Sequence, residues 1–183
     1  MEENIQPEQL TEKQVWYALR TFNCQEQKVS SFLTEKGYLH FIPMVYAPPK
    51  KDEKESKKVL VPAVHNLLFI KKSGSLKQMT EVLKECQIPV AFFRYPGMQE
   101  YCEISERDMA EFRMICDPQF TSSTFMTQSE AEAMVGKEVR VISGPFKGSR
   151  GKLIRKSKEY YFLKAMIGMG VMVRIPRWYC KPI

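Results

Sequence analysis

The stretch VRVISGPFKGSRGKLI, residues 139–154, decides the fold of the C-terminal part of the chain. Branched residues at its two ends favour β-strands. Gly144 and Pro145 cannot continue a strand, because glycine is flexible and proline lacks the N–H that a ladder needs. Gly148 and Gly151 flank a Ser-Arg pair and favour a tight turn or a close backbone approach. The stretch therefore predicts a strand, a tight basic loop and a second strand.

More short strands follow this loop. The pattern predicts a hairpin formed by residues 160–167 and 171–175 across Gly168-Met169-Gly170, and a last strand over residues 179–183. About five short strands in roughly fifty residues are typical of a small β-barrel. We therefore expect a five-stranded barrel over residues 135–183.

The positive charge of the chain is concentrated in this barrel. The whole chain has a formal net charge of +7. Residues 135–183 have a net charge of +10, from twelve Lys and Arg against two Glu, whereas residues 1–117 have −1, from sixteen basic and seventeen acidic residues. Such a split favours a basic module that meets RNA or an acidic protein surface, attached to a near-neutral domain with another partner. The alternative is a solvated basic surface.

The first part of the chain predicts a separate mixed domain over residues 15–117. Strands are expected at 15–21, 38–46, 59–72 with a break near Pro62, and 90–95, and helices at 25–36, at 76–86 and after residue 104. Mixed elements of this kind favour helices packed on a largely antiparallel sheet. The predicted fold class is α+β: an N-terminal α/β sandwich, a linker over residues 118–134 and the small barrel.

Two polar segments are expected to lie outside this framework. Residues 1–14 predict a disordered tail, since they are polar and lack a basic start followed by an apolar core. Residues 50–58 carry five Lys and three acids and predict a loop that is either solvated or close to nucleic acid. No run is long and apolar enough for a membrane span, so we expect a cytoplasmic protein without a membrane partner.

Patterns typical of catalysis or cofactor binding are not matched. Aligned with GxxxxGK[ST], the basic loop has Phe146 in place of the first glycine and Leu153 in place of the hydroxyl residue. His40 and His65 have no companion acids at metal-ligand spacing. The five cysteines are widely spaced and predict reduced thiols. We therefore expect no enzyme, no cofactor and no metal site.

Aromatic residues fall on the predicted strands of the first domain. Because successive side chains of a strand point to opposite faces, half of them can fill a core while the other half point outward. A contiguous exposed patch would indicate a protein partner, and the alternative is that all are core residues. They are Trp16, Tyr17, Phe69, Phe92, Phe93 and Tyr95.

Residues 139–154 resemble a KOW motif, and the basic five-strand module is similar to the C-terminal KOW domain of NusG proteins. Three segments resemble, in order, the signatures of the NusG N-terminal domain: VWYALRT from residue 15, NLLFIK from 66 and VAFFRYPG from 90. The resemblance covers about residues 15–183. With IPRWYCKPI at its end and FMTQSEAEAMVGKEVRV before the loop, the chain is most similar to specialised bacterial paralogues of the UpxY type.

This resemblance implies a transcription antitermination and elongation factor that binds RNA polymerase and increases its processivity on specific long operons, such as polysaccharide biosynthesis clusters. The N-terminal domain would bind the clamp helices of the largest subunit and bridge the DNA cleft, with nucleic acid of the elongation complex nearby. The KOW domain would contact a ribosomal protein or a termination factor. We expect a monomer.

Two other functions remain open from the sequence. One is a general NusG-type elongation factor that couples polymerase to the ribosome or to a termination factor. The other, from a different class, is a KOW-containing RNA-binding or ribosome-associated protein, which rests on the basic module alone.

The resemblance also implies site residues. In the first domain the polymerase-binding candidates are Arg20, Leu67, Phe69 and Tyr95, with Leu67 at a position that is often aromatic in relatives. The second helix in relatives faces the opposite jaw of the cleft; the His-Thr-rich motif of the RfaH type is missing here, which leaves the candidates Gln78 and Thr80.

A second set of candidates lies in the KOW loop, which is expected to form an exposed tip that contacts the second partner. A flexible linker would raise the local concentration of this module near that partner. The alternative is a tight turn whose glycines only close the barrel. The candidates are Phe146, Lys147, Ser149 and Arg150.

Overall fold

The computed structural model of the protein describes residues 14–47, 58–119 and 123–183. Nearly all of the predicted tail of residues 1–14 and of the predicted loop of residues 50–58 lies outside these ranges.

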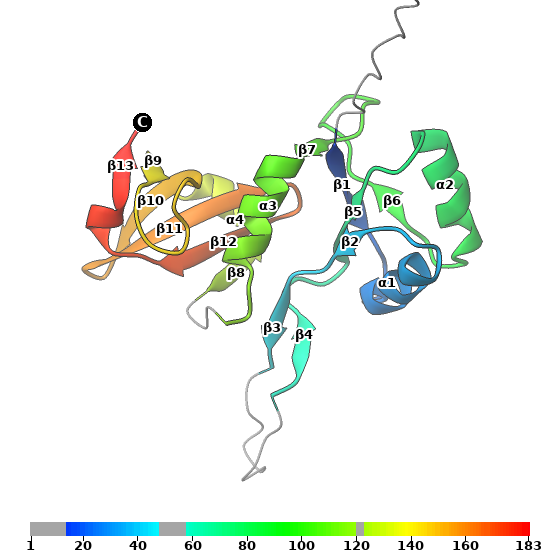
Figure 1. The fold of residues 1–183 in the computed structure, drawn as a ribbon, viewed down its shortest axis with the longest axis horizontal. Helices are drawn as coiled ribbons and strands as arrows, with labels where there is room; N and C mark the ends of the chain where they lie inside the picture. Colours follow the sequence, from blue (N-terminus) through cyan, green and yellow to red (C-terminus); the bar gives the residue numbers. More distant parts are fainter. Residues whose placement is uncertain (1–13, 48–57, 120–122) are drawn as a thin grey trace, which may run out of the picture.

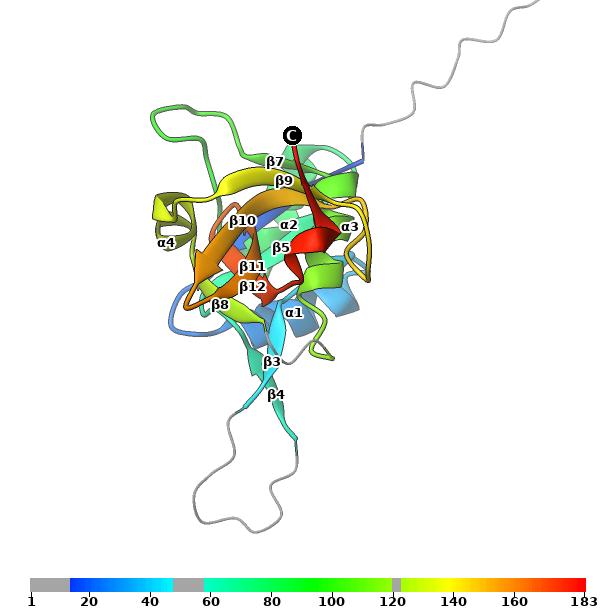
Figure 2. The same ribbon diagram turned by 90° about the vertical axis from the view of Figure 1, so that its left-hand side faces the viewer.

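The first domain is built on an antiparallel sheet of five strands, in the order β2-β5-β1-β6 with β7 also paired to β1. Strands β3 and β4 form a separate pair that projects from the body of the molecule (Figures 1 and 2). The elements are β1 (Val15–Arg20), α1 (Glu26–Glu35), β2 (His40–Phe41), β3 (Met44–Tyr46), β4 (Leu60–Pro62), β5 (Leu67–Lys71), α2 (Leu76–Glu85), β6 (Ala91–Phe92), β7 (Glu103–Ser105) and α3 (Glu106–Ile115).

Strand β1 is apolar along nearly its whole length because both faces of this sheet are covered. Tyr17 and Leu19 point to the face on which α1 and α2 pack, where they form one core cluster with residues such as Leu68 and Leu33. Trp16 and Ala18 point to the opposite face, which α3 covers. An uninterrupted apolar run is typical of a strand that is buried on both sides.

The second domain is an antiparallel sheet in the order β13-β9-β10-β11-β12-β8. Its strands β9 to β13 are the five that the sequence predicts. The elements are β8 (Thr124–Thr127), α4 (Gln128–Ala133), β9 (Lys137–Val141), β10 (Arg150–Lys156), β11 (Glu159–Met166), β12 (Met169–Arg174), the 3-10 helix η1 (Arg177–Tyr179) and β13 (Cys180–Pro182). The predicted α+β fold class is confirmed.

Ordered elements occupy much of the range that was predicted as a linker, residues 118–134. Strand β8 adds a sixth strand beside β12, and α4 packs on the sheet through the fully buried Ala131. Thr127 and Glu130 have the spacing of a capping box and form one at the start of this helix, with Glu130 N donating to Thr127 Oγ1 at 3.3 Å. This part of the chain therefore belongs structurally to the second domain.

The basic loop between β9 and β10 is the tight turn that the sequence predicts. Gly148 has a φ of +98°, which only glycine adopts easily. Gly151 lies so close to the backbone of Leu163 and the ring of Phe162 that a Cβ would clash with both. The glycines of this loop are accounted for by backbone geometry.

Two predicted strands are shorter than expected. The strand predicted over residues 38–46 is divided into β2 and β3 at Ile42-Pro43, since proline cannot donate to a ladder. The strand predicted over residues 90–95 contains only β6 and an isolated bridge between Arg94 and Tyr101.

The two domains pack against each other and share one apolar core. Helix α3 lies between them (Figure 1), and its Met109 and Phe112 have no exposed surface. One continuous cluster joins Trp16 and Phe69 of the first sheet, through these α3 residues, to residues of the second sheet. The second-domain members of this cluster are Val139, Val141, Phe146, Phe162, Met166, Met169, Val171, Val173 and Ile175.

Candidate functional site

A cationic and apolar surface lies on the first sheet beside α3. The register places Arg20 of β1 opposite Leu67 of β5 on one side and Ala91 of β6 on the other. The guanidinium carbon of Arg20 lies 5.1 Å from the ring centroid of Phe93, a cation–π distance. Arg20 is exposed, whereas Phe93 is half-buried. We call Arg20, Leu67 and Phe93 the Arg20 surface.

The turn between β11 and β12 covers part of the Arg20 surface. Gly168 in this turn has a φ of +88°. A Cβ on Gly168 would lie 2.8 Å from Leu67 Cδ1 and 3.4 Å from Phe93 Cζ. The backbone of the turn therefore lies directly on these two side chains, and Leu67 is buried as a result. The Gly168 amide also donates to Gln128 Oε1 at 2.8 Å, which holds the turn on α4.

An ion-pair cluster joins the domains beside this contact. Lys164 of β11 is only 8% exposed, and its Nζ lies 2.9 Å from Glu111 Oε2 and 3.2 Å from Asp108 Oδ1, both on α3. Arg107 Nε donates to the other oxygen of Glu111 at 3.2 Å. Burial alone would raise the pKa of Asp108, but the Ser105 hydroxyl and the Lys164 ammonium outweigh it and lower the pKa. The interdomain contact is therefore stabilised by charge as well as by apolar packing.

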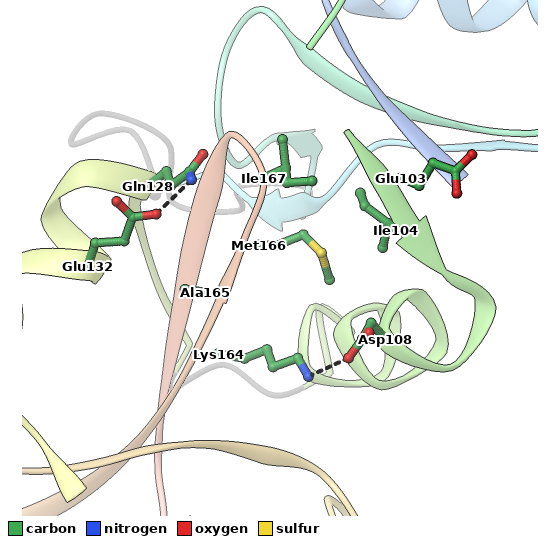
Figure 3. A pocket seen from close by; sticks show the side chains of 9 residues that line it. All are labelled: Glu103, Ile104, Asp108, Gln128, Glu132, Lys164, Ala165, Met166 and Ile167. Atoms are coloured by element: carbon green, nitrogen blue, oxygen red, sulfur yellow. Dashed lines mark hydrogen bonds and ion pairs between the residues drawn. The ribbon is translucent and has the colours of Figure 1, made fainter. Parts of the chain in front are cut away.

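An open cleft of about 360 Å³ adjoins these ion pairs. Figure 3 shows Lys164 reaching from the second domain to Asp108, while Met166 points toward Ile104 of β7. The residues that line the cleft are Glu103, Ile104, Asp108, Gln128, Glu132, Lys164, Ala165, Met166 and Ile167. Across the described ranges, no group of three or more His, Cys, Asp or Glu side chains is placed to hold a metal ion. The cleft lies at the rim of the domain interface, since its lining comes from both domains.

Two family models match the chain. Residues 14–113, more than half of the chain, match the family described as transcription termination factor nusG, and residues 135–160 match the KOW motif. The chain belongs to the NusG family. No curated protein matches it.

Membership of the NusG family establishes the general kind of protein. NusG proteins are non-catalytic factors of transcription elongation and antitermination that act by binding RNA polymerase. In the part of the chain that the structure describes, no helix is long and apolar enough to cross a membrane.

The candidates for NusG-type polymerase binding in the first sheet differ in whether their side chains are exposed or buried. Arg20 and Tyr95 are exposed, and Tyr95 retains 40% of its surface. Phe69, a candidate for polymerase binding, is covered by α3: its ring has no exposed surface and lies 5.6 Å from the Phe112 ring. Leu67 is covered by the β11–β12 turn. Neither Phe69 nor Leu67 can touch a partner while the domains are packed together.

The two candidates on α2 already make hydrogen bonds within the helix. Gln78 Oε1 accepts from the Ser75 amide at 2.8 Å, as part of a capping box that was not predicted. Thr80 Oγ1 donates to the Leu76 carbonyl at 2.8 Å. Gln78 is exposed and Thr80 half-buried, so Gln78 is the more accessible of the two.

The KOW loop is only partly the exposed tip that was expected. Lys147 and Arg150 are exposed, but Phe146 is 4% exposed and belongs to the shared core, and Ser149 is fully buried. The expectation for these two residues is wrong, because the short loop folds its one aromatic side chain over the end of the sheet. The hydroxyl of Ser149 has no hydrogen-bond partner among the described residues.

Sequence reasoning missed three residues of this region. Phe93 was assigned to the aromatic strands without a role, and Gly168 to a turn. Lys164 had a signal that went unused: it lies between Phe162 and Met166 at the period of two that places side chains on the buried face of β11. A lysine at such a position is almost never fully buried unless paired.

Proposed function

We propose that the protein is a NusG-type antitermination factor that binds RNA polymerase through the Arg20 surface and increases processivity on specific long operons, such as polysaccharide biosynthesis clusters. The observation that carries the proposal is the arrangement of Arg20 over Phe93 beside Leu67, at the part of the first sheet on which the β11–β12 turn lies. Arginine and aromatic residues dominate the energetics of protein interfaces. Such a surface suits a protein groove of the kind that the clamp helices form.

Polymerase binding through this surface requires the second domain to move. The turn at Gly168 lies on Leu67 and Phe93, so a partner can reach these side chains only after the turn has left. Only Arg20 of the three residues is exposed in the packed arrangement. The intrinsic affinity for polymerase is therefore reduced by the fraction of molecules in which the domains are apart.

The KOW domain would then be available to a second partner. Lys147 and Arg150 remain exposed on its loop and are the candidates for a ribosomal protein or a termination factor. Phe146 and Ser149 would support the loop from inside.

Binding is tested by capture of core RNA polymerase with the full chain and with Arg20→Glu. Arg20 is exposed, so the variant should fold, and it should lose most of the captured polymerase. Lys28→Glu is the matched control, because Lys28 is an exposed cation of the same domain on α1, on the other side of the sheet. Polymerase without its clamp helices should not be captured by the unaltered chain; capture that is unchanged would contradict the proposal.

The operon-specific role needs a separate experiment. Polymerase occupancy along the genome, compared with and without the gene, should show loss of the distal part of one or a few long operons. A broad change across most genes would instead indicate a general elongation factor that couples polymerase to translation or termination.

A further inference from the structure

A second open cleft, of about 530 Å³, lies on the first domain between the β3–β4 pair and the C-terminal half of α3. This volume is within the range of about 300–1,000 Å³ that is typical of small-molecule sites. Of the ten described residues that line the cleft, eight are apolar. One wall comes from Phe41, Ile42, Met44 and Leu60, and the other comes from α3 and the residues that follow it. We call it the α3 cleft.

The α3 side of this cleft is a different helix face from the one that meets the second domain. Ala110, Arg113 and Met114 line the cleft, and their i, i+3, i+4 spacing places them on one face of the helix. Met109 and Phe112 instead belong to the core that the two domains share. A ligand in the α3 cleft would therefore bridge α3 and the β3–β4 pair within the first domain.

Arg113 supplies a positive charge at the α3 cleft. Its side chain is exposed, and its guanidinium carbon lies 5.6 Å from the ring centroid of Phe41 and 5.8 Å from that of Trp16. These cation–π contacts hold the planar group over two rings. The guanidinium makes no ion pair and no hydrogen bond with the other described residues. Its N–H donors are therefore available to a ligand, in the fork that matches a carboxylate.

Glu106, two turns earlier on α3, already has other partners. Hydrogen bonds from Lys71 and Trp16 lower the pKa of Glu106, and the charge of Arg113 only adds to this effect. Glu106 Oε2 lies 2.9 Å from Lys71 Nζ and 2.9 Å from Trp16 Nε1. This carboxylate is therefore not a competing partner for the Arg113 guanidinium.

Asp117 is the one acid among the described residues that line the α3 cleft, and it limits which anions fit. Its Oδ1 accepts from the Gln119 amide at 2.9 Å. The carboxylate and the negative end of the α3 dipole oppose further negative charge. Burial raises the pKa of the Cys116 thiol, so this group is uncharged and adds to the apolar wall. The cleft accordingly favours a ligand with one carboxylate at Arg113 over a phosphate or a dicarboxylate.

We propose that the α3 cleft binds a small amphipathic carboxylate, with its apolar body between α3 and the β3–β4 pair and its carboxylate on Arg113. A guanidinium binds a carboxylate through two parallel hydrogen bonds, which fixes the orientation of the ligand. The apolar walls gain from covering an aliphatic chain or a ring but not from covering a polar ligand. A neutral apolar compound would leave Arg113 unused, and Arg113 would repel a cationic one.

This site is separate from the surface proposed for polymerase. None of the three residues of the Arg20 surface is among the described residues that line the α3 cleft. Binding of the carboxylate does not depend on the proposed polymerase contact and can be tested without polymerase.

The test measures binding of octanoate to the full chain by isothermal titration calorimetry, with octanol and octylammonium as the matched neutral and cationic ligands. Octanoate should bind about fivefold more tightly than octanol, which is the most that an ion pair near the surface adds. In Arg113→Gln this advantage should disappear, while the affinity for octanol should stay within about twofold. Lys28→Gln is the matched control, because Lys28 is an exposed cation on α1 outside the cleft.

The methionines show where the ligand binds. Met44 and Met114 line the α3 cleft, whereas Met166 lines the cleft at the domain interface. With isotope-labelled methionine methyl groups, octanoate should shift the NMR signals of Met44 and Met114 and leave that of Met166 unchanged; a Met→Leu variant at each position assigns its signal.

Filling the α3 cleft tests its shape apart from its charge. Ala110 is exposed within the cleft, so Ala110→Phe should be tolerated by the fold and should occupy the space of the ligand. This variant should weaken the binding of octanoate and octanol alike. Circular dichroism of each variant separates loss of binding from loss of folding.

Three outcomes would overturn the proposal. Octanoate does not bind the unaltered chain; or it shifts Met166 rather than Met44 and Met114, which would place it at the domain interface. The third is equal binding of octanoate, octanol and octylammonium with no effect of Arg113→Gln, which would indicate an apolar surface that meets another protein.

Discussion

Replacing Lys164 with methionine should separate the two domains without unfolding either. Methionine is flexible and fills a similar space, so the change removes charge more than volume. Of the two ion pairs that the variant removes, the pair with Glu111 contributes more than the pair with Asp108. The Lys164 and Glu111 side chains are 9% and 13% exposed, and Lys164 Nζ lies 2.9 Å from Glu111 Oε2. A hydrogen bond to a charged group contributes about 1.5–3 kcal/mol in such a setting. Asp108 is 53% exposed, so its share is at most about 0.5 kcal/mol.

The expected effect of Lys164→Met on the packing of the domains is therefore about 2–3 kcal/mol. Since each 1.4 kcal/mol is tenfold, the fraction of molecules with separated domains should rise about 30- to 140-fold. Arg107 stays paired with Glu111 in the variant, so the Glu111 carboxylate keeps one cationic partner. We therefore expect a rise near the lower end of this range. Amide hydrogen exchange should show this rise in the β11–β12 turn, which contacts the first domain.

Two further variants make this result interpretable. Arg174→Met removes an exposed pair with Glu159 inside the second domain and should change exchange at the turn by less than about twofold. The double variant Lys164→Met/Glu111→Met also removes the carboxylate that Lys164→Met leaves without its ammonium partner. Part of the protection against hydrogen exchange at the β11–β12 turn should therefore return. The reasoning is refuted if Lys164→Met exchanges at the turn no faster than Arg174→Met does.

Three other perturbations test neighbouring parts of the structure. Gly168→Ala combines backbone strain with a clash against Leu67 and should open the domains, whereas Gly148→Ala has the same strain in open space and should not; hydrogen exchange at the turn compares them. Phe69→Ala should destabilise the fold by about 3–5 kcal/mol in urea titration, while Tyr95→Ala should leave stability within about 0.5 kcal/mol. Burial alone would raise the pKa of Glu26, but backbone and His65 hydrogen bonds lower it below 4.5. Because the folded-state pKa of Glu26 is depressed, the ionised carboxylate stabilises the fold above pH 4.5, and this contribution is lost as the pH falls through the folded-state pKa. Glu26→Gln should therefore lose less stability on acidification than the unaltered chain; equal losses would contradict the reasoning.

The sequence was sufficient for those elements whose signal is local. The apolar run of β1, the helical spacing of α2 and the capping box at Thr127 each depend on residues within a few positions of one another. The basic loop was predicted for the same reason, since the geometry that requires Gly148 is set within one turn.

The burial of Phe69 beneath α3 could not be predicted from local residues. A period of two shows which residues of β5 share a face, but it does not show what covers that face. The cover is Phe112, which lies more than forty residues later on α3. The same holds for Leu67, which is covered by a turn about one hundred residues away. Phe146 does have a local signal, because it is an aromatic residue within the polar and basic loop SGPFKGSR. That signal fits a residue that anchors a partner as well as it fits a core residue.

If polymerase binds the Arg20 surface as proposed, the shared core makes domain separation and polymerase binding parts of one equilibrium. If the second domain leaves, Leu67 and Phe93 lose their cover, and so do Met166 and Met169 on its own sheet. Exposed apolar surface of this kind is unfavourable by about 25 cal/mol for each Å². A partner that covers the Arg20 surface recovers this energy on the first domain but not on the second. The separated state should therefore become populated mainly when both surfaces have partners. A ligand that covers Met166 and Met169 of the second domain should increase the affinity of the first domain for a partner of the Arg20 surface, whereas a ligand that binds only the exposed Lys147 and Arg150 should not.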